Sequence, residues 1–172
     1  MAQQRRRRCI MADFYLGANL VFLQMSGARE DILREMAENL VKEDLVEASF
    51  VSGIIEREKE YPTGLPTGSS ISVAIPHTDI EHVKRNAISI AVLKEPASFR
   101  VMGESSMETP VSIIFMLAMK ESHAQLSLLK DLMTFLQDEA MLRDLYDSAT
   151  KEEVVRLIDR NLSLTASKGG DR

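Results

Sequence analysis

The apolar run that precedes His77 constrains the fold most strongly, because it reads as a buried strand that ends on a histidine. Ile71, Val73 and Ile75 alternate with small residues, which is typical of a strand with one buried face. Pro76 has no backbone N–H to offer to a central ladder, so the strand should end there. We therefore expect His77 at a strand end, where a loop can expose its imidazole.

Hydrophobic periodicity predicts further strands and helices on both sides of this strand. The predicted strands cover residues 19–25, 86–93 and 111–119, with a short edge strand at 99–102. Two helices are predicted before the histidine strand, one from an N-cap at Ser26 through Val41 and one from Glu43 or Asp44 to Lys59. Three more are predicted after it: one that starts after Ser122, a short one around residues 141–145, and one from about Thr150 to Ile158. Two prolines and two glycines within residues 61–70 predict an irregular loop before the histidine strand.

Length and composition favour one domain. The chain has 172 residues, of which 45% are apolar, and this is enough for one sizeable core. No repeat or internal linker divides it, and helices on both sides of a block of buried strands are typical of an α/β fold. We expect a basic tail at residues 1–12, a single domain at 13–162 and a flexible polar tail at 163–172.

Charge and hydropathy argue against two classes of function. The net charge of -5 disfavours general nucleic-acid binding, which needs a basic face. The run Arg5–Arg8 reads as a solvated tail, and the lone Cys9 cannot form an internal disulfide. No apolar segment reaches the roughly 18 residues of a membrane-spanning helix. We expect a cytoplasmic protein that binds no nucleic acid and does not insert into a membrane.

A metal site is the main rival to histidine chemistry, since the chain has three histidines and many carboxylates. The spacing disfavours it, because His77 and His82 are five residues apart rather than the three or four that align ligands on a helix. The ten methionines fall at apolar positions and read as core residues. We predict no metal and no cofactor, and we assign no role to His82, which lies in a charged connector.

Five short segments together resemble a known family. They are residues 56–58, 62–68, 73–79, 115–118 and 123–126. In this order and spacing they resemble the IIA component of the phosphoenolpyruvate-dependent sugar phosphotransferase system, in its fructose–mannitol class, from about Gly27 to Ile158. The Pro-Thr-Gly-Leu loop with Ile-Pro-His-Thr-Asp is most similar to the galactitol-type branch. The resemblance implies an α/β fold in which helices flank a mixed β-sheet on both sides.

The resemblance also implies a phosphoryl relay, in which the carrier protein HPr phosphorylates a IIA histidine that then passes the group to a cysteine of IIB. His77 matches the phosphorylated residue, a tele-phosphohistidine intermediate. His123 and Arg57 match the second histidine and the arginine of the site, while Thr63 and Gly64 match loop positions beside it. The implied activity is that of a phosphotransferase, its partners are HPr and IIB with a membrane IIC, and no cofactor is implied.

The chemistry of these residue types fits the relay. Phosphoryl transfer mainly requires groups to be positioned and charge to be offset. A neutral imidazole such as that of His77 is a sufficient nucleophile, and a hydrogen bond to its second nitrogen can fix the tautomer. Arg57 offers forked donors to the equatorial oxygens, and His123 can donate to the same group.

Other interpretations stay open. Arg57 and His123 also fit ordinary helix-end residues. A phosphoryl group adds about -1.5 to -2 charge, so His77 can equally serve a regulator whose phosphorylation state controls the binding of a partner protein. A structural or ligand-binding domain would need an inert His77. Because no phosphate-cradling loop surrounds Cys9, the chain resembles a free-standing IIA, and a galactitol-like sugar is only a hint from the branch.

Overall fold

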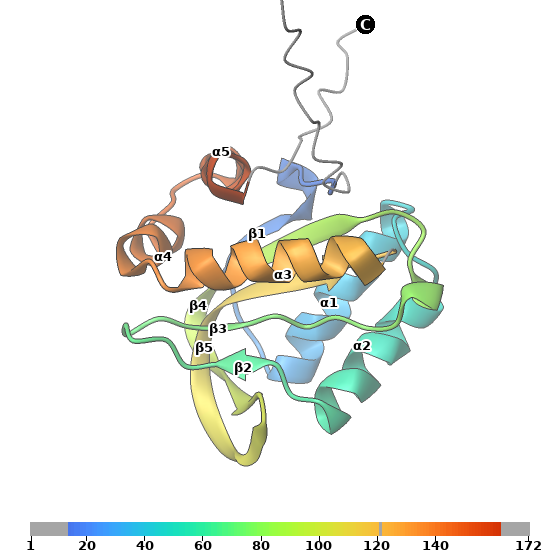
Figure 1. Cartoon of the computed structure of the whole chain (residues 1–172), viewed down its shortest axis with the longest axis horizontal. Coiled ribbons are helices and arrows are strands. Elements are labelled where there is room, and N and C mark those ends of the chain that lie inside the picture. Colours follow the sequence, from blue (N-terminus) through green and yellow to red (C-terminus); the bar gives the residue numbers. More distant parts are fainter. Residues whose placement is uncertain (1–13, 121, 163–172) are drawn as a thin grey trace, which may run out of the picture.

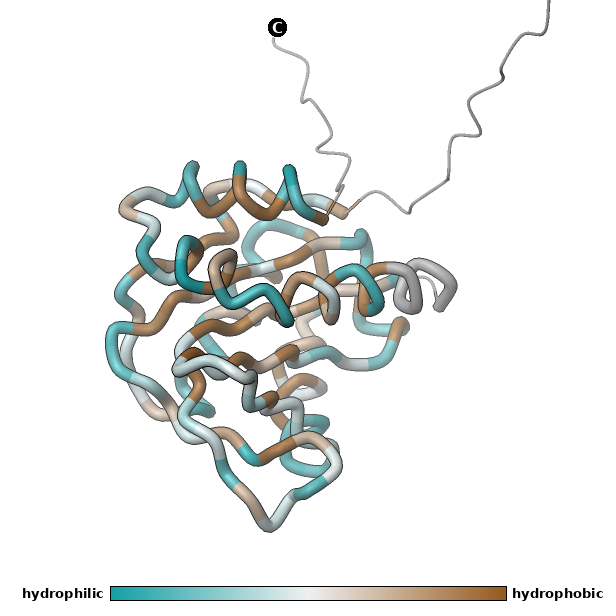
Figure 2. The backbone as a smooth tube through the Cα atoms, turned by 60° about the vertical axis from the view of Figure 1, so that its left-hand side comes forward, coloured by the Kyte–Doolittle hydropathy of each residue, from teal (hydrophilic) through white to brown (hydrophobic). Residues whose placement is uncertain are grey.

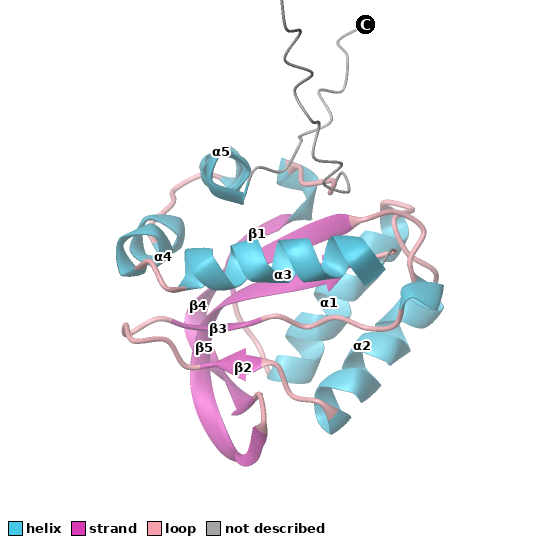
Figure 3. Ribbon diagram, viewed as in Figure 1, coloured by secondary structure: helices cyan, strands magenta, loops and turns pink. Residues whose placement is uncertain are grey.

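The structure is a computed structural model that describes residues 14–120 and 122–162, with the backbone alone at 122–127 (Figures 1 and 3). The tails predicted at residues 1–12 and 163–172, with Arg5–Arg8 and Cys9, lie outside the described residues. The elements are η1 (Ala18–Leu20), β1 (Val21–Met25), α1 (Arg29–Lys42), α2 (Ser49–Glu60), β2 (Gly64–Leu65), β3 (Ser72–Ala74), η2 (Ile80–His82), β4 (Ala87–Val101), β5 (Glu104–Ala118), α3 (Ser122–Leu136), α4 (Glu139–Tyr146) and α5 (Lys151–Leu162).

A long antiparallel hairpin of β4 and β5 forms the centre of the sheet. β1 runs parallel to β4, and β3 runs parallel to β5. The short β2 pairs antiparallel with β3 and meets the far end of β4 through a parallel bridge between Gly64 and Val101. The sheet is therefore mixed, as the resemblance implies.

Helices cover both faces of this sheet, because its strands are apolar on both sides. Along β5, Ile113, Phe115 and Leu117 belong to the core that α3, α4 and α5 cover. The intervening residues, among them Ile114 and Met116, belong to the core under α1 and α2. Figure 2 shows this order as hydrophobic strands inside and hydrophilic outer turns on the helices. The prediction of an α/β fold with helices on both sides is confirmed.

The helix boundaries near residue 45 differ from those predicted. Helix α2 begins at Ser49, not at Glu43 or Asp44, because Asp44 adopts a positive φ of 58° that interrupts the helical path. Ser26 is not the N-cap of α1; that position is Ala28, which makes no side-chain cap bond. The apolar Val46, read as helical, instead pairs with Val83 in an isolated bridge.

The strands are also longer and more connected than predicted. Residues 99–102 do not form a separate edge strand, because β4 continues through an irregularity after Val92 and keeps pairing with β5 up to Val101. The loop at residues 61–70 is not wholly irregular, since it contains β2. The histidine strand β3 is buried on both faces rather than one, since Ser72 and Ala74 are buried as well as Val73.

Candidate functional site

His77 lies just beyond the end of β3 and is partly exposed, as the strand pattern predicts. Its backbone is held against β5, because the Leu117 N–H donates to the Pro76 carbonyl oxygen at 2.9 Å. His77 and Leu117 form an isolated parallel bridge. Pro76 therefore ends the regular strand but still serves as an acceptor, which fixes the path of the chain at the histidine.

One hydrogen bond sets the chemistry of the His77 ring. Nδ1 lies 2.8 Å from the carbonyl oxygen of Ile75. A carbonyl oxygen can only accept, so Nδ1 carries the proton in the neutral ring and donates it. The lone pair of the neutral imidazole then belongs to Nε2, which is the nitrogen available as a nucleophile.

Two pockets of similar size meet at His77. The first, of about 440 Å³, is mostly apolar; it is lined by Arg57, Tyr61, Pro62, Thr63, Ile75, His77, Met102, Leu129 and Met133. The second, of about 450 Å³, is more polar; it is lined by Arg57, His77, Thr78, Asp79, Ile80 and Glu81. His77 and Arg57 line both pockets, so the structure brings these two residues together, with Thr63 beside them in the first.

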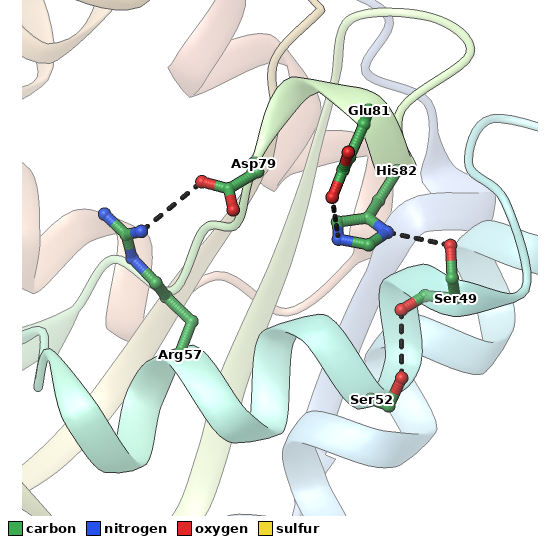
Figure 4. A network of polar contacts seen from close by, with 6 residues as sticks. All are labelled: Ser49, Ser52, Arg57, Asp79, Glu81 and His82. Atoms are coloured by element: carbon green, nitrogen blue, oxygen red, sulfur yellow. Dashed lines mark hydrogen bonds and ion pairs between the residues drawn. The ribbon is translucent and has the colours of Figure 1, made fainter.

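Arg57 extends from α2 towards the segment that follows His77 (Figure 4). Its Nη1 lies 3.3 Å from Oδ1 of Asp79, and its guanidinium carbon lies 4.7 Å from the ring centroid of Tyr61. Both members of the ion pair are more than a third exposed, so the pair contributes little to stability. Arg57 is thus oriented by weak contacts that an incoming anion can replace.

A network of polar contacts holds the segment after His77 against α2 (Figure 4). The His82 Nδ1 and the Ser49 hydroxyl oxygen are 2.7 Å apart, and the His82 Nε2 lies 3.5 Å from Glu81. Gly53 permits the close approach, because a Cβ there would lie 3.1 Å from the Thr78 hydroxyl oxygen. His82, to which we assign no role from the sequence, contributes to this anchor through its contact with Ser49.

Glu58, next to Arg57 on α2, is a buried carboxylate that sequence reasoning missed. It is 5% exposed, and both of its oxygens accept from Thr63: Oε1 from the backbone N–H at 2.9 Å and Oε2 from the hydroxyl at 2.7 Å. Burial raises the pKa of Glu58, while the two bonds from Thr63 and the charge of Arg29 oppose that rise. The carboxylate fixes the loop wall that Thr63 contributes to the first pocket.

The raised pKa of Glu58 predicts the sign of a pH effect on stability. Above its ordinary pKa of 4.5 the folded state binds more protons at this carboxyl than the unfolded state does. The free energy of unfolding of the wild type should therefore fall as pH rises through this window. Glu58→Gln has no carboxyl to titrate at this position. The free energy of unfolding of Glu58→Gln, measured with urea, should therefore rise relative to that of the wild type between pH 4.5 and neutral pH. Glu60→Gln, at an exposed site on the same helix, should show no such increase, and a flat difference for Glu58→Gln would contradict the assignment.

Gly64 lies where two strands approach closely. Its carbonyl accepts from the Met102 N–H at 2.8 Å, and a Cβ at Gly64 would lie 2.5 Å from the Arg100 carbonyl oxygen. Gly64→Ala should therefore destabilise the protein by about 1–3 kcal/mol in urea unfolding. Gly68→Ala is the matched control, because no heavy atom lies within 4 Å of a Cβ there, and we expect it within about 0.5 kcal/mol of the wild type. Equal free energies of unfolding for the two variants would contradict this prediction and would show that β2 can shift to accommodate the extra methyl group.

The remaining sequence predictions concern His123, metals and membranes. The backbone of His123 lies in the first turn of α3, but its side chain lies outside the described residues, so its role stays a prediction. Among the side chains of residues 14–120 and 128–162, no group of three or more His, Cys, Asp or Glu is placed to hold a metal ion. In the same part of the chain, no helix combines the length and hydropathy needed to cross a bilayer.

Comparison with known proteins identifies the family. Residues 14–161 match the family described as "Phosphoenolpyruvate-dependent sugar phosphotransferase system, EIIA 2". The chain belongs to this EIIA 2 family. The match spans the elements from β1 to α5, and it includes every residue that we place around the two pockets. The family assignment therefore rests on the same stretch of chain that forms the candidate site.

Two relatives of this EIIA 2 domain are named for different sugars. It is 30% identical over 149 residues to the mannitol-specific EIICBA component of Escherichia coli (strain K12), covering 84% of this chain but 22% of that protein. The chain thus spans about a fifth of the length of that relative. It is 24% identical over 135 residues to the galactitol-specific EIIA component of the same strain, covering 78% and 86% of the two chains. The sugar branch predicted from the loop motif stays a prediction.

Solved structures agree with the family. A complex of enzyme IIAMTL with phosphorylated enzyme IIBMTL from Escherichia coli contains a chain that matches with a TM-score of 0.70 and 26% identity, over 86% of this chain and 99% of that one. The crystal structure of IIA mannitol from Escherichia coli matches with a TM-score of 0.67 and 25% identity, over 84% and 99%. These two solved structures thus share the fold of this chain, and one of them is a complex with a phosphorylated IIB.

Proposed function

We propose that this EIIA 2 domain accepts a phosphoryl group from phospho-HPr on Nε2 of His77 and passes it to a cysteine of a IIB component for sugar uptake. The observation that carries the proposal is the Nδ1 hydrogen bond to Ile75, which leaves the Nε2 lone pair on a residue that lines both pockets with Arg57. We place the reaction in the cytoplasm, with a membrane IIC completing the transport system.

Each step exchanges one bond to phosphorus. In the first, the Nε2 lone pair of His77 bonds to phosphorus while the P–N bond to the HPr histidine breaks and its electron pair returns to that ring. In the second, a IIB thiolate bonds to phosphorus and the bond to Nε2 breaks. Nδ1 keeps its proton throughout, because the Ile75 carbonyl holds it. His77 needs no separate base, since the neutral ring already carries a free lone pair.

Arg57 and His123 act on the charge of the transferred group in this proposal. The phosphoryl group spreads negative charge over three oxygens, and a guanidinium offers paired donors to such an anion. Arg57 can leave Asp79 for the phosphoryl group at little cost, because that ion pair is exposed. His123, near the start of α3, is proposed as a second donor by its match to the family. Thr63 lines the first pocket, and Gly64, the next residue along the chain, is proposed only by its match to the family.

The partner and the sugar rest on the relatives. The solved complex of IIAMTL with phosphorylated IIBMTL supports a IIB acceptor, and HPr as donor follows from the family relay. The loop motif favours a galactitol-like sugar, whereas the relatives are named for mannitol and for galactitol. Transfer of the phosphoryl group from this chain to a galactitol IIB or a mannitol IIB, compared side by side, would separate the two branches.

The experiment that tests the proposal is incubation of the purified chain with phosphoenolpyruvate, enzyme I and HPr. We expect a mass increase of one phosphoryl group that is labile in acid and stable in base, as a phosphohistidine is. Omission of HPr should prevent it. If this chain stays unmodified while a control IIA in the same tube is phosphorylated, the proposed transfer is wrong.

A regulatory role is the second candidate, and one comparison favours it. The chain is 33% identical over 102 residues to the transcriptional regulator ManR of Bacillus subtilis (strain 168), covering 59% of this chain and 14% of that protein. A phosphoryl group on His77 would add negative charge beside the exposed Tyr61 and Ile80, which suits a switch in protein binding. A chain that is phosphorylated by HPr but passes nothing to either IIB would favour this role.

A further inference from the structure

A continuous series of hydrogen bonds joins the buried Glu58 to the ring of His77. Oε1 of Glu58 accepts from the Thr63 N–H at 2.9 Å. The Thr63 carbonyl oxygen accepts from the Ile75 N–H at 3.3 Å. The Ile75 carbonyl oxygen accepts from His77 Nδ1 at 2.8 Å. The carboxylate is thus three bonds away from the contact that selects the tautomer of His77.

This series is shielded from water for most of its length. Glu58, Thr63 and Ile75 are 5%, 3% and 2% exposed. Water cannot readily replace a partner that is lost there, so a missing acceptor at Glu58 would leave the buried Thr63 N–H without a bond. The hydroxyl of Thr63 makes a second hydrogen bond to the same carboxylate, donating to Oε2 of Glu58 at 2.7 Å. Two bonds to one carboxylate restrict both the position and the rotation of this loop residue.

On its C-terminal side Thr63 is followed by Gly64, whose carbonyl oxygen accepts from the Met102 N–H, and on its other side it is held by Glu58. β2 is only two residues long and begins directly after Thr63. The Thr63–Ile75 bond, at 3.3 Å, lies outside the regular ladder of β2 with β3, which pairs Gly64 with Ala74 and Leu65 with Val73. The position of the Ile75 N–H relative to the loop therefore depends on the position of the Thr63 carbonyl oxygen. Glu58 restrains that residue by binding its N–H and its hydroxyl.

We propose that Glu58 is a positioning residue for His77: by clamping Thr63 it fixes the Ile75 carbonyl that keeps the imidazole in its Nδ1–H form. The orientation of the ring is a property of the free protein. Its effect on the rate of phosphorylation rests on the proposed function. A residue that merely stabilises the end of α2 would lower the free energy of unfolding without changing the tautomer of His77, so the two roles are separable.

Nitrogen-15 NMR of the His77 imidazole is the decisive measurement, because it distinguishes Nδ1–H from Nε2–H rings. At a pH where the ring is neutral, the wild type should show the Nδ1–H form alone. Glu58→Ala should show a mixture of both forms and a phosphorylation rate lower by on the order of tenfold or more. Glu58→Gln should restore the single form, because an amide oxygen accepts the Thr63 N–H and the amide NH₂ donates to the hydroxyl.

Two further variants keep the test sharp. Glu60→Ala removes an exposed carboxylate from the same turn of α2 and should leave both the tautomer and the rate unchanged. Thr63→Val removes only the hydroxyl arm of the clamp and should give a smaller share of the Nε2–H form than Glu58→Ala. If circular dichroism shows Glu58→Ala to be unfolded, Thr63→Val decides the question in its place.

The outcomes separate this inference from the proposed function. A pure Nδ1–H ring in folded Glu58→Ala, or in Thr63→Val where that variant decides, overturns the positioning role, whatever the phosphorylation assay shows. A mixture in Glu58→Ala with a single form in Glu58→Gln supports it. If the tautomer responds in this way but the wild type accepts no phosphoryl group from HPr, the positioning of His77 stands and the proposed transfer fails.

Discussion

His77→Ala should abolish phosphorylation of the chain by phosphoenolpyruvate, enzyme I and HPr, with no mass increase at times when the wild type is fully modified. The substitution removes the only nitrogen that the Ile75 hydrogen bond leaves with a free lone pair beside Arg57. Because covalent transfer requires a nucleophile to bond to phosphorus, the expected loss is at least about 10³-fold. Intact-protein mass spectrometry over a time course measures it directly.

Folding must be checked in the same experiment, because His77 also forms a bridge with Leu117. His77→Gln is the matched variant: it retains an amide donor for the Ile75 carbonyl, and it lacks a nucleophilic nitrogen. Both variants should unfold at temperatures close to that of the wild type and remain unmodified. An acid-labile phosphoryl group on folded His77→Ala would show that another histidine, His82 or His123, is the acceptor.

Arg57→Ala should slow phosphorylation by about 10²- to 10³-fold while leaving His77 chemically competent. The guanidinium lines both pockets beside His77, and its pairing with Asp79 is exposed enough to be exchanged for a phosphoryl group. Arg57→Lys should recover only part of the rate, because an ammonium keeps the charge and loses the fork of paired donors. Rapid-quench measurement of the phosphorylated fraction gives the rate constants.

The control for Arg57 is another arginine on the covering helices. Arg34 on α1 pairs with Glu30 at 3.4 Å and is half exposed, so Arg34→Ala removes an equal charge from outside the site. We expect its rate to equal that of the wild type. If Arg57→Ala and Arg34→Ala behave alike, Arg57 is only a solvated residue near the end of α2, as its sequence context alone allows.

Most of the fold could be predicted because its signals are local. Runs of apolar residues predict β1, β3, β4 and β5, and three- and four-residue spacing predicts the helices. The start of α2 could not be predicted, since Leu45 and Val46 continue the apolar pattern and only the backbone shows the positive φ of Asp44. The full length of β4 depends on its pairing with β5, and that pairing cannot be inferred from the sequence of β4 alone.

The site was less predictable than the fold. The strand pattern places His77 at a strand end, but its partnership with Arg57 and Thr63 followed from the resemblance to a family and not from spacing. Glu58 reads in the sequence as one more charge near a helix end, and only the structure shows that it is buried and that both of its oxygens accept from Thr63. His82 was missed for a similar reason, because the Ser49 that it contacts lies 33 residues earlier in the chain.

The pairing of the His77 segment with β5 has a consequence for the order of synthesis. The Leu117 N–H that binds the Pro76 carbonyl belongs to a strand made after the histidine. A ribosome adds residues from the N-terminus, so His77 joins the chain before any residue of β5 does. A nascent chain that stops before Leu117 carries the imidazole without the strand that fixes its backbone, and completion of the hairpin determines when the histidine takes its final place.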